Sequence, residues 1–414
     1  MPSDIIILGI SILIAIGILL HHPSKTLGLP SLLIFMGVGL AFGNGEFGFV
    51  YDDLKLTSLI GTLALNTIVF VGGLNTPMKH IQFSWKEGGM LSTAGVIFTT
   101  VIFGFILNAL LDFNLITCML FAAVVSSTDA AAVFSILESK KLKLKYGTGT
   151  ILEFESATND PVALLMVVML TDYIINSANG APTALSILSS LVQQIGVGVV
   201  VGLIMGKMAV WALNRIKLPE FGLIPVFILA TFAITVSSTE ILGGNELIAV
   251  YIAGVIIGNY LKKGAEVSKH FFNGISWLAQ SLMFIILGLQ IFPQKLLPVL
   301  MVSLLPAILL ILVARPLAVQ LCYLPFKQVN WRKRLFVSMI GLKGATPIVF
   351  ALIPAAAGVE GSREMIHMVF FIVLISVIVQ GAAIEPLANK LKLNLKPKPP
   401  KPPKPPKPPK LPKV

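Results

Sequence analysis

The amino-acid sequence predicts an all-α membrane protein that crosses the bilayer about thirteen times. The mean hydropathy is +0.89, and only 12% of the 414 residues are charged, about half of the roughly 25% found in soluble chains. Apolar stretches of about 20 residues, the length that spans a bilayer, recur along the whole chain. This composition argues against a soluble enzyme, a nucleic-acid binder or a disordered scaffold.

Thirteen apolar segments emerge from a window of about 19 residues. They lie at residues 4–20, 27–43, 56–74, 89–111, 114–137, 149–172, 184–206, 221–239, 245–261, 275–292, 296–325, 334–357 and 365–388. The first follows Met1-Pro2-Ser3-Asp4, with no basic region before it and no small-residue cleavage site after it. It is therefore predicted to be a membrane span rather than a removable signal peptide.

The basic residues predict how the segments are oriented. With thirteen spans, the loops on the side of the C-terminus hold 19 lysines and arginines, against 3 on the other side, before the C-terminal tail is counted. By the positive-inside rule the N-terminus lies outside and the C-terminus lies in the cytoplasm. One misassigned span would disrupt this alternation, so the distribution also supports the number of spans.

Residues 1–390 are thus predicted to form one transmembrane domain, and residues 391–414 a cytoplasmic tail. From Lys396 to Val414 the tail holds seven lysines, ten prolines and no acid, a composition that favours extended polyproline II. The loops and this tail account for the net charge of +12, so no nucleic-acid partner is expected. Attraction of the tail to anionic lipids and a freely solvated tail are the alternatives.

Five charged residues lie deep inside predicted spans. They are Asp129, Glu155, Asp160, Arg315 and Lys343. Each costs about 2.5 to 3.5 kcal/mol at the centre of a span, and such residues usually pair with one another or line an ion path. The functional centre is therefore expected among them.

The acids lie in two neighbouring spans with polar residues beside them. The fifth span contains Ser126-Ser127-Thr128-Asp129 and the sixth contains Glu155-Ser156-Ala157-Thr158-Asn159-Asp160-Pro161. On a helix, Ser156 and Asp160 lie one turn apart on one face, and Pro161 frees one backbone carbonyl nearby. These hard oxygen ligands suit an alkali cation rather than zinc or iron.

A carboxylate at such a position can bind a proton as well as a cation. Because both neutralise the same oxygens, the two compete, and competition at a site reached alternately from either side is sufficient for exchange. The alternative is that Asp129 and Asp160 only hold helices together through hydrogen bonds.

The twelfth span contains Gly341-Leu342-Lys343-Gly344-Ala345-Thr346-Pro347, which predicts a helix break within the membrane. Transporters built from inverted repeats carry interrupted helices at corresponding positions of their two halves. The fifth and twelfth spans are seven apart, as expected if spans 1 to 6 and 8 to 13 are inverted-topology repeats. Both spans are therefore predicted to be interrupted helices that cross.

Four motifs together resemble the NhaP-type monovalent cation:proton antiporters, most closely the bacterial potassium/proton branch. They are Ser-Thr-Asp-Ala-Ala-Ala-Val-Phe-Ser at 127–135, Glu-Ser with Asn-Asp-Pro at 155–161, Ala-Arg-Pro-Leu-Ala-Val at 314–319, and Gly-Leu-Lys-Gly-Ala at 341–345 followed by Pro-Ile-Val at 347–349. The resemblance covers about residues 5–390. It implies a homodimer in the cell membrane, in which a core domain moves like an elevator against a dimerisation domain.

The resemblance also implies roles for the site residues. Asp160 would be the principal carboxylate for cation and proton. Asp129, the backbone at Thr128, Ser156 and Asn159 would complete the site. Asparagine at position 159, where electrogenic relatives carry a second aspartate, resembles the electroneutral exchangers.

Glu155 would pair with Arg315, an ion pair that fixes the core rather than binding substrate. Lys343 departs from the family, which usually has arginine there; a buried lysine can lose its proton, whereas arginine effectively cannot. The potassium branch usually continues into a folded cytoplasmic regulatory domain, whereas here the Lys/Pro tail follows the last span.

The sequence thus predicts a secondary antiporter rather than an enzyme, exchanging K+ or Na+ for H+ with no cofactor beyond the transported ions. Three alternatives differ in what they require. A cation channel needs a ring of carbonyls or carboxylates, usually from several subunits, and an organic-solute symporter needs a larger polar site with an aromatic clamp. An intramembrane aspartyl protease normally has Gly-x-Gly before its second aspartate, which neither Asp129 nor Asp160 has.

Overall fold

The computed structural model describes residues 31–43, 53–111, 113–129, 142–176, 184–216, 220–292 and 296–395, with isolated residues between 11 and 19, between 133 and 140, and at 294. Within these residues the chain is helical apart from loops and one β-bridge between Leu144 and Asn394. The all-α prediction is therefore confirmed for this part of the chain.

The helices follow one another along the chain with short connections. They are α2 (Ser31–Phe42), α3 (Leu54–Asn75), α4 (Met78–Ser92), α5 (Ala94–Leu110), α6 (Leu115–Val124), η1 (Lys145–Gly147), α8 (Thr148–Asn176), α9 (Ala184–Arg215), α10 (Leu223–Ile241), α11 (Glu246–Tyr260), α12 (Ala265–Leu289), α13 (Leu296–Leu309), η4 (Leu310–Ala314), α14 (Arg315–Cys322), α15 (Trp331–Met339), α16 (Thr346–Ala356) and α17 (Ser362–Lys390).

Eight helical stretches of the described chain are long and apolar enough to cross a membrane, and α6, α11 and α16 are shorter apolar helices. Helices form in such a setting because each backbone N–H and C=O must be paired without water. The predicted segment 4–20 lies mostly outside the described residues, and each of the other twelve contains helix. The protein is therefore a multi-pass membrane protein.

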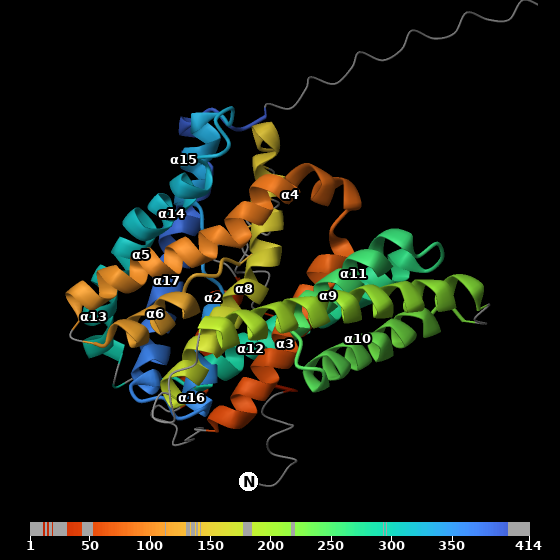
Figure 1. The fold of residues 1–414 in the computed structure, drawn as a ribbon, viewed down its shortest axis with the longest axis horizontal. Helices are drawn as coiled ribbons and strands as arrows, with labels where there is room; N and C mark the ends of the chain where they lie inside the picture. The colour runs from red at the N-terminus through yellow and green to blue at the C-terminus, as the bar shows by residue number, and fades with distance from the viewer. Residues whose placement is uncertain are drawn as a thin grey trace, which may run out of the picture.

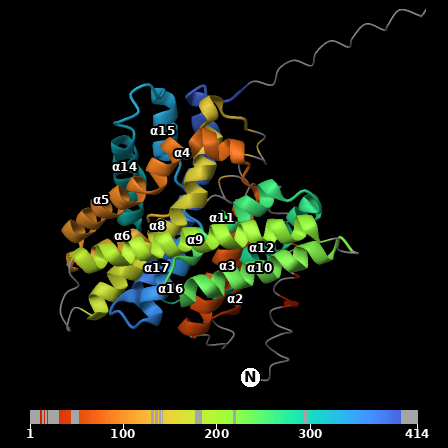
Figure 2. The same ribbon diagram turned by 45° about the vertical axis from the view of Figure 1, so that its right-hand side comes forward.

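The helices pack as two groups. The scaffold group consists of α2, α3 and α9 to α12, and the site group consists of α4, α5, α6, α8 and α13 to α17. Figure 1 shows α5, α14 and α15 on one side of the molecule and α10 and α11 on the other, an arrangement that is kept in Figure 2. The groups meet where α16 packs on α3 and where α8 packs on α11.

Glycines bring the backbones of the scaffold group into close contact. A Cβ atom on Gly258 of α11 would lie 2.0 Å from the carbonyl oxygen of Leu74, and one on Gly202 of α9 would lie 2.6 Å from that of Ala249. Only a residue without a side chain permits this approach, as is usual where membrane helices pack tightly. Helix α11 is therefore held firmly between α3 and α9.

Two helices of the site group are interrupted. Helix α6 ends at Val124 and the chain is non-helical to Asp129, while residues 340–345 separate α15 from α16. The amide of Asp129 donates a hydrogen bond of 2.8 Å to the carbonyl of Leu342, so the two breaks lie side by side. The breaks predicted in the fifth and twelfth segments are present.

The described chain stays packed for five residues past the boundary predicted at 390. The amide of Lys145 donates to the carbonyl of Leu393 (2.8 Å) and that of Leu395 donates to Lys143 (2.7 Å). The side chain of Leu393 is fully buried. Residues 391–395 therefore belong to the packed part of the protein, and the Lys/Pro repeat lies outside the described residues.

Candidate functional site: a carboxylate cluster at two helix breaks

A lysine side chain ties the two helix breaks together. The ammonium group of Lys343 donates to the carbonyl oxygens of Ser126 and Ser127, each at 2.9 Å. Those carbonyls belong to the non-helical segment after α6. Lys343 is 1% exposed, so this contact gives the two backbone acceptors a buried donor within the membrane.

The Asp129 carboxylate lies against the second break. A Cβ atom on Gly344 would lie only 1.7 Å from its Oδ2 atom. The break therefore needs glycine at position 344 for the carboxylate to approach the backbone. This contact and the Asp129–Leu342 hydrogen bond fix one acid of the site at the crossing point.

Helix α8 supplies the second acid and its polar neighbours. The hydroxyl of Ser127 donates to the carboxylate of Asp160, and the amide nitrogen of Asn159 donates to the Thr128 hydroxyl at 2.6 Å. The hydroxyls of Thr128 and Ser156 lie 2.9 Å apart. All five side chains are at most 7% exposed, so the unwound segment and α8 enclose one buried cluster of oxygen atoms.

Further groups act on Asp160 from the second break. The Thr346 side chain, at the start of α16, hydrogen-bonds to its carboxylate, and Asp129 and Lys343 lie close enough to interact with it electrostatically. Thus one carboxylate, 7% exposed, is contacted by hydroxyl groups of the segment after α6 and of α16, with a second carboxylate and an ammonium group nearby. Hard oxygen donors of this kind suit an alkali cation.

Glu155 and Arg315 form a buried ion pair beside this cluster. Arg315 donates to the Oε1 atom of Glu155, and the two side chains are 3% and 1% exposed. Arg315 follows a π-helical turn, η4, in which its amide bonds to the carbonyl of Leu310. Such turns occur where a helix adjusts to place a functional side chain, and here the turn directs a buried arginine toward α8.

The structure thus brings together every residue that the sequence analysis assigned to the site. Those residues are Thr128, Asp129, Glu155, Ser156, Asn159, Asp160, Arg315 and Lys343. Ser127 and Thr346 were not predicted to lie in the site, although both belong to its sequence motifs. They contribute hydroxyls rather than charges, and nothing in the sequence orients a hydroxyl toward Asp160.

Two polar residues of α17 hold the second break in place by hydrogen bonds, and this was not predicted from the sequence. The hydroxyl of Ser376 accepts a hydrogen bond from the Lys343 amide (2.9 Å) and donates to Gln380 (2.6 Å). The amide nitrogen of Gln380 in turn donates to the carbonyl of Met339, at the end of α15 (2.9 Å). The sequence contained one indication of this contact, namely two polar residues one helical turn apart within the apolar segment 365–388.

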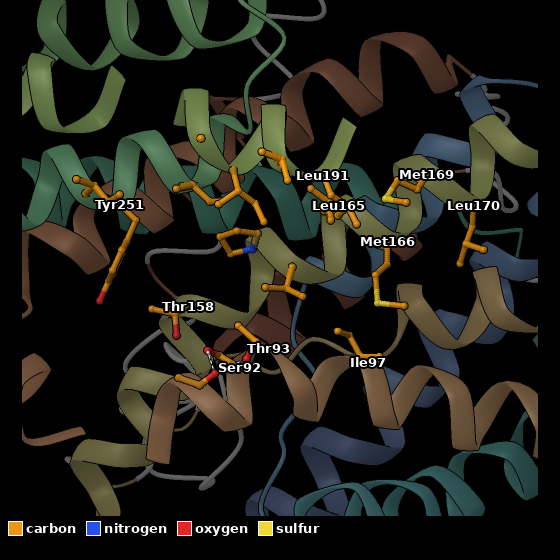
Figure 3. Close-up of a pocket in the computed structure, with 18 of the residues that line it drawn as sticks. Ser92, Thr93, Ile97, Thr158, Leu165, Met166, Met169, Leu170, Leu191 and Tyr251 are labelled. Atoms are coloured by element: carbon orange, nitrogen blue, oxygen red, sulfur yellow. Dashed lines mark hydrogen bonds between the residues drawn. The ribbon is translucent and has the colours of Figure 1, made fainter. Parts of the chain in front are cut away.

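A large cavity lies along α8, beside α9 and α11 (Figure 3). Its volume is about 1170 Å³, and apolar side chains of α8, α9 and α11 form most of its wall, among them Leu165, Met166, Leu191 and Ile252. The hydroxyl of Thr158 in its wall donates to the Phe154 carbonyl of its own helix. Ser156, Asn159 and Asp160 do not line it, so this cavity is separate from the cluster of oxygen atoms around Asp160.

A multi-pass helical membrane protein whose buried carboxylate, Asp160, lies beside two helix breaks has the architecture of a transporter. The chain belongs to the family described as sodium/hydrogen exchanger, transmembrane, whose model matches residues 10–390. Within it, the protein is of the NhaP type.

Relatives match over nearly the whole chain. The K+/H+ antiporter NhaP2 of Shewanella sp. strain MR-4 is 37% identical over 94% of this chain and 67% of its own length. The K+/H+ antiporter NhaP of Alkalimonas amylolytica is 34% identical over 95% of this chain and 68% of its own. The Na+/H+ antiporter NhaG of Bacillus atrophaeus is 27% identical over 89% of this chain and 69% of its own.

A solved structure has the same fold. The sodium proton antiporter MjNhaP1 of Methanocaldococcus jannaschii at pH 8 superposes with a TM-score of 0.82, covering 94% of this chain and 99% of that one. The two sequences are 22% identical. This comparison therefore supports the arrangement of the helices and not the identity of the transported ion.

Proposed function

We propose that the protein exchanges K+ or Na+ for H+ across the cell membrane, with Asp160 as the carboxylate that binds each in turn. The main support for this proposal is the position of Asp160. Its side chain is 7% exposed and is hydrogen-bonded to Ser127 beside the two helix breaks. The names of the K+/H+ and Na+/H+ antiporters among the relatives support the same reaction.

The chemistry of the exchange follows from competition for one carboxylate. When Asp160 is ionised, its carboxylate oxygens and the neutral side-chain oxygens of Thr128, Ser156 and Asn159 can replace part of the water shell of a monovalent cation. When a proton binds, the carboxylate becomes neutral and no longer attracts the cation. Since either ligand neutralises the site, the site can cross the membrane loaded with one or the other.

Movement of the site group against the scaffold group would expose Asp160 to alternate sides. In this elevator-type motion the interrupted helices move with α8 as one body, which the Lys343 contacts and the Glu155–Arg315 pair hold together. The α3–α9–α11 packing provides the stationary partner, and we propose that two such chains associate through their scaffold groups as a homodimer.

We also propose that one cation is exchanged for one proton. Asn159 donates to Thr128 through its amide, and an amide binds no proton at physiological pH. With Asp160 as the exchanging carboxylate, one cation replaces one proton and no net charge moves. An imposed membrane potential should then leave the exchange rate unchanged, whereas Asn159→Asp, which adds a further carboxylate next to Asp160, should make the rate depend on potential.

The direct test uses purified protein in liposomes with an imposed pH gradient and a pH-sensitive dye. Adding K+ or Na+ should collapse the gradient with the wild-type protein and leave it intact with Asp160→Asn. Asp172→Asn is the matched control, because Asp172 lies on the same helix with an exposed side chain. Wild-type exchange by Asp160→Asn would refute the site; parallel assays with Na+, K+ and Li+ would establish selectivity.

A further inference from the structure

Another carboxylate lies inside the scaffold group, at the first residue of α11. The Oε2 atom of Glu246 accepts a hydrogen bond of 2.6 Å from the side-chain amide of Asn66 on α3. Asn66 is fully buried, and its Oδ1 atom accepts no hydrogen bond from the described part of the chain. A carboxylate and an unsatisfied amide oxygen therefore lie together between two membrane helices.

Among the described residues, no lysine, arginine or histidine forms an ion pair with Glu246. The Glu246 side chain is half-buried at the start of an apolar helix, and a carboxylate in such a helix is usually paired or lines an ion path. A buried amide oxygen that accepts no hydrogen bond also lowers the stability of the folded protein. Neither the Glu246 carboxylate nor the Asn66 Oδ1 atom is thus partnered by a cationic side chain among the described residues.

The neighbouring residue, Asn245, brings this pair beside the Asp160 site. Its side-chain amide donates to the carbonyl of Pro161, the residue after Asp160, at 3.2 Å. Its own amide donates to the carbonyl of Gln194 on α9 at 2.9 Å, and its Oδ1 atom caps α11 through Ile248. Asn245 is 3% exposed, so the turn before α11 is fixed within the protein at the level of Asp160.

The two carboxylates belong to different groups of helices. Glu246 and Asn66 lie on α11 and α3, whose backbones touch at Gly254 and Gly258, whereas Asp160 lies on α8 of the site group. The Asn245–Pro161 hydrogen bond spans the boundary between them. A motion of α8 along the scaffold would change the separation of Glu246 from Asp160 while leaving the Glu246–Asn66 pair intact.

We propose that Glu246 and Asn66 form a second binding site for the transported monovalent cation, on the scaffold, from which the cation passes to Asp160. Carboxylate and amide oxygens are hard ligands that an alkali cation accepts, and the cation would neutralise the carboxylate. This inference rests on the proposed exchange function. The scaffold group would then bind the cation first, in addition to being the stationary partner of the moving site group.

The test compares Glu246→Gln with wild type in the liposome exchange assay. Glutamine can still accept the hydrogen bond from Asn66, so the variant removes the charge and keeps the contact. The apparent KM for Na+ or K+ should rise about tenfold, with the rate at saturating cation within about twofold of wild type. Glu240→Gln, on the exposed end of α10, removes a nearby carboxylate and should leave KM within about twofold.

Direct binding gives a second readout that does not depend on exchange. In Asp160→Asn, Na+ or K+ should still raise the melting temperature of the purified protein, because binding to the native state stabilises it. The increase should disappear in Asp160→Asn/Glu246→Gln. An unchanged KM in Glu246→Gln, or no cation-dependent stabilisation in Asp160→Asn, would leave the pair a purely structural contact. Wild-type protein without any exchange would instead refute the proposed function.

Discussion

Lys343 on one interrupted helix donates its ammonium hydrogen atoms to the carbonyl of Ser127 on the other, at 2.9 Å. Ser127 in turn donates its hydroxyl to Asp160. The position of the exchanging carboxylate is thus coupled, through one serine, to the lysine that holds the crossing together. Substitutions at the crossing should therefore affect both stability and cation affinity.

Lys343→Met should destabilise the protein and weaken cation binding. The substitution keeps an unbranched side chain but leaves the carbonyls of Ser126 and Ser127 without a donor, and each buried unsatisfied group costs about 1 to 3 kcal/mol. We expect a lower melting temperature of the detergent-solubilised protein, together with a higher KM in the exchange assay.

Lys343→Arg provides the comparison for that variant. Arginine carries more donors than lysine, in a planar arrangement, so it can reach both carbonyls and should recover most of the stability that methionine loses. A methionine variant with wild-type melting temperature and KM would show that the crossing does not depend on this side chain.

Gly344→Ala should abolish exchange by displacing Asp129. The added Cβ would lie 1.7 Å from the Asp129 carboxylate, so the acid or the backbone of the break must move. Overpacking of this kind costs about 1 to 3 kcal/mol, and we expect the exchange rate to fall at least tenfold. Gly89→Ala is the matched control, because a Cβ there meets nothing within 4 Å; equal rates in both variants would contradict the steric argument.

Much of the site could be predicted from the sequence because its members are chemically conspicuous. Charges inside apolar segments single out Asp160 and Lys343, and the glycines and proline around Lys343 predict the break. The partner of Lys343 could not be predicted, because it consists of backbone carbonyls. These become available only when the segment after α6 unwinds beside residues 340–345.

Glu246 shows a different limit of sequence analysis. Hydropathy places it at the edge of the segment 245–261, where an acid is ordinarily a loop residue. Its half-buried position follows from the fold: the preceding residue, Asn245, is bonded to Gln194 within α9 and to Pro161 within α8. The contact of Asn66 with Glu246 joins residues 180 positions apart, which no local pattern reveals.

The Glu155–Arg315 pair should matter more for folding than for cation affinity. Removing one partner of a buried ion pair leaves an uncompensated charge and costs about 3 to 5 kcal/mol. Glu155→Ala and Arg315→Ala should therefore lower the yield of folded protein and its melting temperature more than they change the KM of the folded fraction. Wild-type stability with lost affinity would place both residues in the cation site instead.

Replacing both partners of this pair distinguishes charge balance from geometry. Glu155→Met/Arg315→Met removes both charges, so it should be more stable than either single alanine variant. If the double variant also exchanges cations, the pair serves the fold alone. If it folds but exchanges with a raised KM, the pair also positions the binding residues of α8.

Competition at Asp160 predicts how cation affinity depends on pH. A proton bound to the carboxylate excludes the cation, so the apparent KM for Na+ or K+ should rise as the pH falls. Below the pH at which the site is half protonated, simple competition gives an increase of about tenfold for each pH unit. The maximal rate at saturating cation should change much less, because excess cation displaces the proton.

Measuring exchange at equal pH on both sides, over a series of pH values, separates the apparent KM from the maximal rate. A KM that stays constant while the maximal rate falls would mean that protons inhibit elsewhere, and Asp160 would no longer explain the coupling.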